Sequence, residues 1–237
     1  MSREAISIEV PHQGAGHVSA IVDAPGGPLR AVYVLAHGSG APMTSELLET
    51  LGPLIAERAG IAVVRFNYAY AERMVRTGKR LPPERRPALE AVHGAALEFA
   101  RNRFPKLPLF GGGKSLGGRI STLMAADGTP FDGLVLLGYP LHPAGKLDRL
   151  RVEHFPSIET PALFLQGTRD ALADLDLLER SLPDWTGPTE LHVVEGADHS
   201  FAVLRRSGRT PHEVHDEIAN AVDRWVGSLL GDVTTTR

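Results

Sequence analysis

Short runs of continuous apolar residues alternate with segments of helical periodicity along this chain, and this alternation restricts the possible folds. Clear examples of such runs are Ala31–Ala36 (AVYVLA) and Ile61–Phe66. The segment between them carries apolar residues at helical spacing from Leu47 to Ile55 and meets a stop at Gly60. Continuous hydrophobicity is typical of a strand that is covered on both faces, as in a parallel sheet. The alternation therefore predicts a doubly wound α/β fold.

The same criteria divide the whole chain into expected elements. We expect strands at 5–10, 17–23, 31–36, 61–66, 107–112, 131–137, 162–166 and 190–194. We expect helices from Leu47 to Gly60, at about 87–103, at 115–126 and at 173–181, and a final capped helix that begins at Thr210. Turn residues at 11–14 separate the first two strands. No linker or internal repeat is visible, so we expect one domain over 1–237, with a frayed tail at 231–237.

The stretch Phe110–Gly118 (FGGGKSLGG) allows two interpretations. Its Gly113-Lys114-Ser115 resembles the end of a phosphate-binding P-loop. A P-loop also requires a second glycine, five positions before the glycine that precedes the lysine. Pro108 occupies that position and has no backbone N–H to offer a phosphate. The motif also follows about the fifth strand, whereas a P-loop usually follows the first strand of its domain. Nucleotide binding is therefore disfavoured.

The second interpretation is a nucleophile elbow, G-x-S-x-G, in which a serine lies at a sharp turn between a strand and a helix. Gly113 and Gly117 flank Ser115 at the required spacing, and Gly118 adds a further small residue. Small residues on both sides let the strand and the helix approach each other. A glycine-rich turn with an idle serine is the structural alternative, and only suitable partners for the serine distinguish the two.

Those partners are present in the expected order. A serine hydroxyl needs an adjacent base, and a histidine base needs a carboxylate that fixes its tautomer. Asp170 follows the predicted strand 162–166, and His199 follows the predicted strand 190–194. The order serine, acid, histidine, each after a strand, predicts a catalytic triad of Ser115, Asp170 and His199. Asp174 and Asp176 are rival acids on the following predicted helix, and we expect Asp198 to shape the turn before His199.

An oxyanion hole completes such a site, because the tetrahedral intermediate needs fixed N–H donors. The backbone N–H of Leu116, directly after the nucleophile, is the first expected donor. The second should come from the loop His37-Gly38-Ser39-Gly40, and we assign it to Ser39 in preference to Gly40. We expect the His37 side chain to organise this loop rather than to transfer protons.

These residues resemble the α/β-hydrolase superfamily over nearly the whole chain. The matching pieces are LAHGSGAPM, GGKSLGGR, LFLQGTRD and GADHSF. Within the superfamily the chain looks like the compact, lidless dienelactone-hydrolase type, and most of all like small bacterial proteins described as predicted α/β-hydrolases. The resemblance implies a mostly parallel sheet of about eight strands, flanked by helices on both faces. It also implies that Ser115, Asp170 and His199 form the triad and that no cofactor or metal takes part.

One departure limits what the resemblance implies. Dienelactone hydrolases use a cysteine nucleophile, and this chain has no cysteine, so their substrate is not carried over. The stretch between Leu137 and Ala162 is short, which predicts an open pocket without a large lid and disfavours a long-chain lipase. We therefore expect a serine hydrolase of carboxylic esters or related small acyl compounds. Thioesterase, acyltransferase or peptidase activity of the same triad, and a binding or scaffold role, remain alternatives.

Several side chains are weaker candidates. Tyr68, Tyr70, Tyr139 and Leu141 follow strand ends on the site side and could line the pocket, although core packing would explain them equally well. The basic segment 72–86 is expected to be a solvated loop, and a rim that attracts an anionic substrate or partner is the alternative.

A zinc helix is not expected. His212-Glu213-Val214-His215 has its histidines one position closer than H-E-x-x-H requires, so a capped surface helix is favoured.

Composition excludes other classes of protein. The absence of cysteine removes disulfide frameworks and thiolate metal sites, and a net charge of -3 gives no indication of nucleic-acid or membrane binding. The start, MSREAISIEV, lacks the apolar core of a signal peptide, and no run is long enough to span a membrane. We expect a cytoplasmic protein that acts on a small-molecule acyl substrate, and the sequence does not determine its oligomeric state.

Overall fold

The computed structural model describes residues 1–11 and 16–231. The predicted turn at 11–14 and the predicted tail at 231–237 lie outside the described residues, apart from Pro11 and Gly231.

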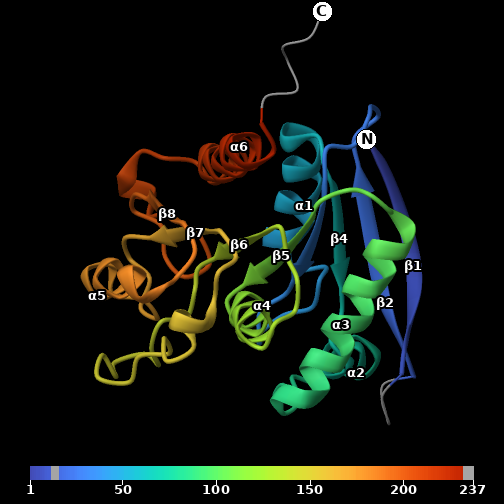
Figure 1. Ribbon diagram of the computed structural model, residues 1–237. Coiled ribbons are helices and arrows are strands. Elements are labelled where there is room, and N and C mark those ends of the chain that lie inside the picture. Colours follow the sequence, from blue (N-terminus) through green and yellow to red (C-terminus); the bar gives the residue numbers. More distant parts are fainter. Residues whose placement is uncertain (12–15, 232–237) are drawn as a thin grey trace, which may run out of the picture.

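A single eight-stranded sheet forms the centre of the molecule (Figure 1). Its order is β1-β2-β4-β3-β5-β6-β7-β8, in which β1, β2 and β4 are joined antiparallel and all further neighbours are parallel. The strands are β1 (Ser2–Val10), β2 (Gly16–Ala24), β3 (Val32–Ala36), β4 (Ala62–Phe66), β5 (Leu109–Lys114), β6 (Gly133–Leu137), β7 (Ala162–Gly167) and β8 (Thr189–Val194). The predicted mostly parallel sheet is confirmed.

Helices cover both faces of this sheet. They are α1 (Glu46–Ala59), α2 (Ala69–Thr77), α3 (Arg86–Arg103), α4 (Leu116–Ala126), α5 (Leu175–Ser181) and α6 (Pro211–Leu230), with short 3-10 turns at Phe155–Ser157, Leu182–Asp184 and Arg205–Ser207. One apolar core joins α1 and α6 to the first face, and two further cores join α2, α3, α4 and α5 to the other. Figure 1 shows α1 and α6 on the opposite side of the sheet from α3 and α4.

The burial of the strands follows the sequence pattern. All residues of β3, β4, β5, β6 and β7 are buried, as expected for continuous apolar runs between two helical layers. The edge strand β1 is exposed over its first residues and alternates only near Val10. Because the parallel strands share one direction, the loops after β3, β5, β7 and β8 gather at one edge of the sheet, where the candidate residues lie.

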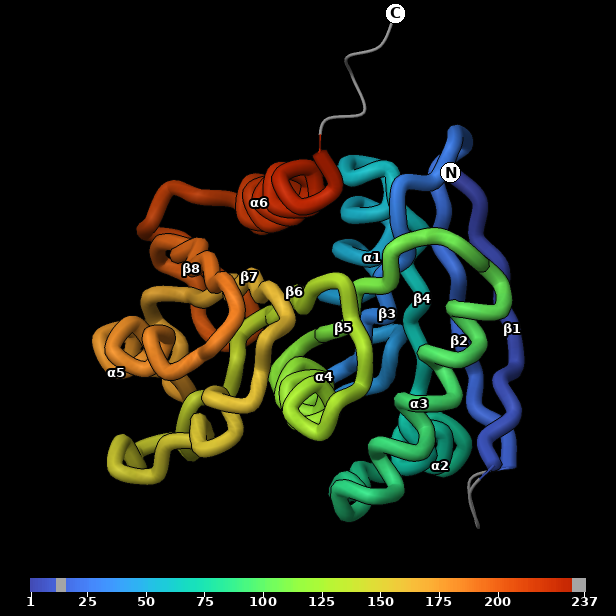
Figure 2. The backbone as a smooth tube through the Cα atoms, viewed as in Figure 1, coloured from blue at the N-terminus to red at the C-terminus, as the bar shows by residue number. Residues whose placement is uncertain are grey.

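The connection between β6 and β7 is short and carries only the 3-10 turn Phe155–Ser157. In Figure 2 this connection, drawn in yellow, runs as a loop without a helical subdomain. The prediction that the chain has no large lid is therefore confirmed.

One expectation about secondary structure is wrong. The basic segment 72–86 was expected to be a loop, but its first part belongs to α2, which ends at Gly78 in the left-handed conformation. The signal was available in the sequence, since Tyr70, Ala71 and Met74 have helical spacing and all three pack into one core. The prolines that follow this short helix in the sequence favoured the expectation of a loop.

The ends of the other helices agree with the sequence. Gly60 ends α1 at φ 63°, and Thr210 and Glu213 form the predicted capping box of α6. No helix in residues 1–11 and 16–231 combines the length and the apolar character that crossing a membrane would require.

A buried ion network ties the loop after β3 to the sheet. Arg65 on β4 is 0% exposed and contacts Asp23 on β2, 1% exposed, with Nη2 and Oδ2 2.8 Å apart. Its Nη1 also donates to Glu49 Oε1 at 2.7 Å and to the carbonyl of Met43 at 2.8 Å. Gly52 on α1 leaves room for this guanidinium, because a Cβ there would lie 2.7 Å from Arg65 Nε. The network thereby positions the loop that carries Ser39.

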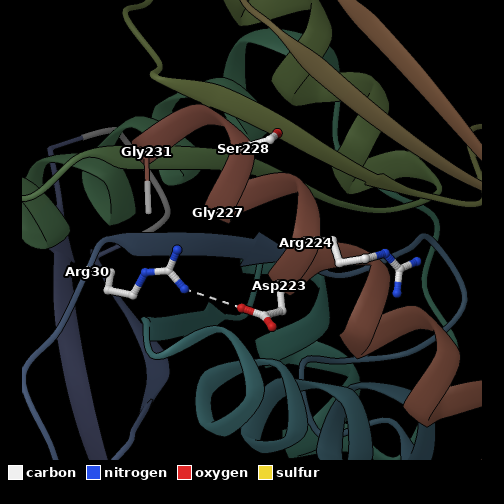
Figure 3. Close-up of a pocket in the computed structure, with 6 residues that line it drawn as sticks. All are labelled: Arg30, Asp223, Arg224, Gly227, Ser228 and Gly231. Carbon is white, nitrogen blue, oxygen red and sulfur yellow. Dashed lines mark hydrogen bonds and ion pairs between the residues drawn. The ribbon is translucent and has the colours of Figure 1, made fainter. Parts of the chain in front are cut away.

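We predict that Asp23→Ala destabilises the fold far more than the removal of a surface carboxylate. Breaking a buried ion pair leaves an uncompensated charge and costs about 3–5 kcal/mol. The matched control is Asp223→Ala, which removes the partly exposed ion pair of Arg30 and Asp223 drawn in Figure 3, worth about 0–1 kcal/mol. Urea unfolding of both variants measures the difference. Equal losses would contradict the role given to the Arg65 network.

Candidate active site

Ser115 lies at the apex of the turn between β5 and α4, as predicted. Its φ of 50° and ψ of -109° are rare for a residue with a side chain, and such strain costs on the order of 1–3 kcal/mol. Arg119 N–H donates to the Ser115 carbonyl at 3.0 Å and so continues the turn into the helix. The strained turn presents the hydroxyl at the end of the strand, as a nucleophile elbow requires.

Glycines make this turn possible. A Cβ on Gly113 would lie 2.2 Å from the carbonyl oxygen of Ala36, and one on Gly117 would lie 2.6 Å from the same atom. A Cβ on Gly112 would lie 2.0 Å from the Val135 carbonyl oxygen. The strand and the helix therefore approach β3 and β6 more closely than any side chain would allow.

The structure brings Ser115, Asp170 and His199 together. His199 Nε2 lies 2.9 Å from Ser115 Oγ, and His199 Nδ1 lies 2.7 Å from Asp170 Oδ2. A carboxylate only accepts hydrogen bonds, so Nδ1 is the protonated nitrogen and Nε2 presents its lone pair toward the serine. This is the arrangement in which a histidine can accept a proton from a serine hydroxyl.

Asp170 is held firmly in this orientation. Gln166 Nε2 donates to its Oδ2 at 2.5 Å and the Leu172 N–H donates to its Oδ1 at 2.8 Å, while the carboxylate is 0% exposed. The predicted rival Asp174 instead caps α5, where its Oδ1 accepts from the Leu177 N–H. Asp170 is therefore the acid that the fold places beside the histidine.

The loop that carries His199 has its own supports. Asp198 Oδ1 accepts from the Ser200 N–H and the Ala202 N–H, so Asp198 shapes this turn as predicted. Phe201, two residues after the histidine, is buried and has a φ of 61°.

Two residues that were predicted as oxyanion donors lie beside Ser115. Leu116 begins α4 and Ser39 lies in the loop after β3, and both line a cavity beside Ser115. Neither N–H donates a backbone hydrogen bond within the part of the chain that the structure describes. Their N–H groups are therefore free of backbone partners among the described residues, and a helix N-terminus favours negative charge. Their role as oxyanion donors stays a prediction.

His37 organises the loop after β3. Its Nε2 accepts from the Tyr68 N–H at 3.0 Å, and its Nδ1 lies 2.7 Å from the Gly38 carbonyl oxygen. Burial lowers the pKa of His37 to about 4, so the ring is neutral near physiological pH. The first contact joins the loop after β3 to the chain after β4, and the second lies within the loop, which agrees with the predicted structural role.

Sequence reasoning missed Lys114, whose side chain enters the site. Its Nζ lies 3.1 Å from His199 Nε2 although the residue is only 8% exposed. Burial lowers the pKa of Lys114 to about 8, and the carboxylates of Asp170 and Asp198 partly offset this. The sequence held a signal, since Lys114 is the last residue of β5 and shares its face with buried Phe110.

Two cavities adjoin Ser115. The larger, about 450 Å³, contains Lys114 and His199 in its wall and is bordered by Arg80. The smaller, about 260 Å³, is bordered by Arg119 and Arg151. Neither wall contains an acidic residue, so lysine and arginine are the permanently charged side chains that line the two spaces.

The four predicted pocket residues do not line these cavities. Tyr68, Tyr70, Tyr139 and Leu141 are 0% exposed and belong to the cores beneath the helices. Tyr70 Oη donates to the Gly38 carbonyl at 2.9 Å, and Tyr139 Oη donates to the Arg151 carbonyl at 2.7 Å. They hold the loops around the site from behind, and the predicted lining role is therefore wrong.

A third hollow, of about 650 Å³, lies away from these residues. Figure 3 shows it around the ion pair of Arg30 and Asp223, beside the last turns of α6. None of Ser115, Asp170 and His199 borders it. In the predicted surface helix, His212 lies 2.9 Å from Asp216 and its side chain is 83% exposed.

We predict that Gly117→Ala destabilises the protein and lowers the reactivity of Ser115. The added methyl group would press on the Ala36 carbonyl oxygen, and overpacking of this kind costs about 1–3 kcal/mol. The matched control is Gly94→Ala within α3, where a Cβ meets no atom within 4 Å and should stabilise by about 0.4–1 kcal/mol. Thermal unfolding and serine labelling of both variants test this. Unchanged stability and labelling in Gly117→Ala would contradict this prediction, because β3 and α4 could then move apart without loss.

Comparisons with known proteins agree with this architecture. A family described as an alpha/beta hydrolase domain matches residues 29–227. An alpha-beta serine hydrolase homologue from Coxiella burnetii has a similar structure, with a TM-score of 0.71 at 21% identity, over 94% of this chain and 97% of the other. A lidless serine hydrolase from Xanthomonas campestris has a TM-score of 0.69 at 19% sequence identity, over 95% of each chain. A dienelactone hydrolase from Anabaena variabilis also has a TM-score of 0.69 at 19% sequence identity, over 94% of this chain and 96% of the other.

Proposed function

Because the chain belongs to the family of alpha/beta hydrolase domains, we propose that it is a serine hydrolase of carboxylic esters or related small acyl compounds. One observation carries the proposal. A strained, accessible serine lies 2.9 Å from a histidine whose other nitrogen lies 2.7 Å from a buried carboxylate. A structural serine would not need backbone strain, a base and an oriented acid in the same place.

The first half of the reaction forms an acyl-enzyme. Ser115 Oγ attacks the carbonyl carbon while its proton passes to His199 Nε2, and Asp170 stabilises the imidazolium that results. The N–H groups of Leu116 and Ser39 bind the oxyanion of the tetrahedral intermediate. His199 then gives the proton to the leaving group as the bond to that group breaks.

The second half returns the free enzyme. Water attacks the acyl carbon, His199 accepts a proton from it, and a second tetrahedral intermediate forms in the same oxyanion hole. Ser115 then leaves and recovers its proton from His199, which releases the carboxylic acid. No other reactant takes part in either half.

Ser115→Ala tests the proposal directly. We expect a fluorophosphonate to add once to the wild-type protein and not to the variant, as measured by intact-protein mass. Ester hydrolysis should fall by about 10³-fold or more, because the nucleophile is lost while the oxyanion hole remains. A well-folded wild-type protein that forms no adduct would overturn the proposal and favour a binding or scaffold role.

The acid has its own test in Asp170→Asn. An amide at this position favours the wrong tautomer of His199, so hydrolysis should fall by about 10³–10⁴-fold. The matched control is Asp174→Asn, because asparagine caps a helix about as well as aspartate and Asp174 does not touch His199. Steady-state rates of both variants on one ester decide this. An equal effect at the two positions would contradict the role of Asp170.

The acceptor of the acyl group needs a separate measurement, because the same triad serves esterases, thioesterases, peptidases and acyltransferases. Product analysis with ester, thioester and amide substrates, in the presence of competing alcohols and amines, distinguishes them. Formation of the free acid as the main product would support hydrolysis, and transfer to an added alcohol or amine would support an acyltransferase.

A further inference from the structure

Two donors compete for the lone pair of the base. Ser115 Oγ and Lys114 Nζ lie 2.9 Å and 3.1 Å from His199 Nε2, and an imidazole nitrogen with its other nitrogen protonated accepts one hydrogen bond at a time in good geometry. The ammonium of Lys114 therefore occupies the position through which the serine proton must pass. A cation there also opposes the imidazolium that forms when Ser115 loses its proton.

The cations around Ser115 have no acidic partners in the cavity walls. Lys114 and Arg80 border the larger cavity, and Arg119 and Arg151 border the smaller one. None of the four forms an ion pair within residues 1–11 and 16–231. The buried Nε of Arg119 has no hydrogen-bond partner there. By contrast, other arginines of the chain, such as Arg65, pair with carboxylates.

We propose that the substrate is an acyl compound that itself carries a carboxylate, and that this carboxylate binds Lys114 and releases His199 for catalysis. The inference rests on the proposed hydrolase function and adds the substrate class and a specificity-determining residue. The carboxylate enters the larger cavity between Lys114 and Arg80. Pairing with it draws the ammonium away from Nε2, so the lone pair becomes free for Ser115. It also neutralises the charge that opposes the imidazolium.

This arrangement favours carboxylate-bearing substrates through a higher kcat as well as through a lower KM. Binding of a carboxylate to Arg80 alone would strengthen ground-state binding and lower KM. Pairing with Lys114 in addition stabilises the transition state, because the imidazolium exists only there. A neutral ester of the same shape binds but leaves Lys114 on Nε2. A lysine with only a structural role would not distinguish the carboxylate-bearing ester from the neutral one.

The preference should depend on pH through the charge of Lys114. Its surroundings are Asp170 from the loop after β7, Asp198 and His199 from the loop after β8, and Arg80 across the cavity. With a pKa of about 8, Lys114 is a cation below this pH and becomes neutral above it. The preference for the charged ester should therefore be full near neutral pH and decline above about pH 8. High salt should weaken it as well.

The test compares ethyl hydrogen succinate with ethyl 4-methylpentanoate, which has the same branching but no charge. Ethanol release gives kcat and KM for each. Because a hydrogen bond to a charged group contributes about tenfold or more in binding or rate, we expect the wild type to prefer the succinate about tenfold or more in kcat/KM. In Lys114→Met the ratio should fall toward unity, because the charged ester loses its partner and the neutral ester no longer meets an ammonium on His199 Nε2. Arg80→Gln should lower the ratio mainly through KM.

Arg76→Gln is the matched control, since Arg76 lies in the same basic segment but borders neither cavity beside Ser115. Its ratio should equal that of the wild type. A wild-type ratio near unity, or a full preference retained in Lys114→Met, would overturn the inference. If Lys114→Met does not fold, the decline of the wild-type preference above about pH 8 decides in its place.

Fluorophosphonate labelling separates this inference from the proposed function. A wild-type protein that is labelled at Ser115 but shows no preference for the charged ester refutes the role of Lys114 and leaves the hydrolase proposal intact. A protein that is neither labelled nor active on either ester refutes the hydrolase proposal itself. Faster labelling of Lys114→Met than of the wild type supports a lysine that holds back the base, and an unchanged or slower rate contradicts it.

Discussion

The close approach of backbone to backbone around Ala36 is the constraint on which the rest of the site depends. Its carbonyl oxygen lies where a Cβ of Gly113 or Gly117 would be, so β3, β5 and α4 meet only because both residues are glycine. This contact forces the turn at Ser115 into strained geometry and points its hydroxyl toward His199. The same contact brings the loop with Ser39 beside the start of α4, where the proposed oxyanion hole lies.

Buried charge is the second feature that organises the site. One buried cation is paired with carboxylates, and another is not. In the network of Arg65, Asp23 and Glu49 each charge has a partner, which fixes a loop at the edge of the site. Lys114 is also buried, but its Nζ lies beside the base of the candidate triad and it forms no ion pair among the described residues. A charge that is fully paired stabilises a fold, whereas one that lacks a close ionic partner remains available for a ligand.

Sequence reasoning reached the fold and the arrangement of Ser115, Asp170 and His199 because each rests on local patterns. The strands are continuous apolar runs, and each of the three residues lies in the connection that follows a strand, so the topology brings them to one edge. The same reasoning failed for Tyr68 and Tyr139, because a position after a strand end does not determine whether a side chain faces solvent or the core. It also missed α2, whose apolar stripe is short and lies among charged residues.

The sequence by itself therefore determined the α/β-hydrolase architecture, the strained serine turn and the order of the candidate catalytic residues, since glycine spacing, apolar runs and strand ends are properties of neighbours along the chain. Only the tertiary structure decided which charges meet at the site. Lys114 and His199 are far apart in sequence, and Arg80, Arg119 and Arg151 come from separate segments. Their positions depend on how helices and loops pack over the sheet, because electrostatic contacts are set by distance in space.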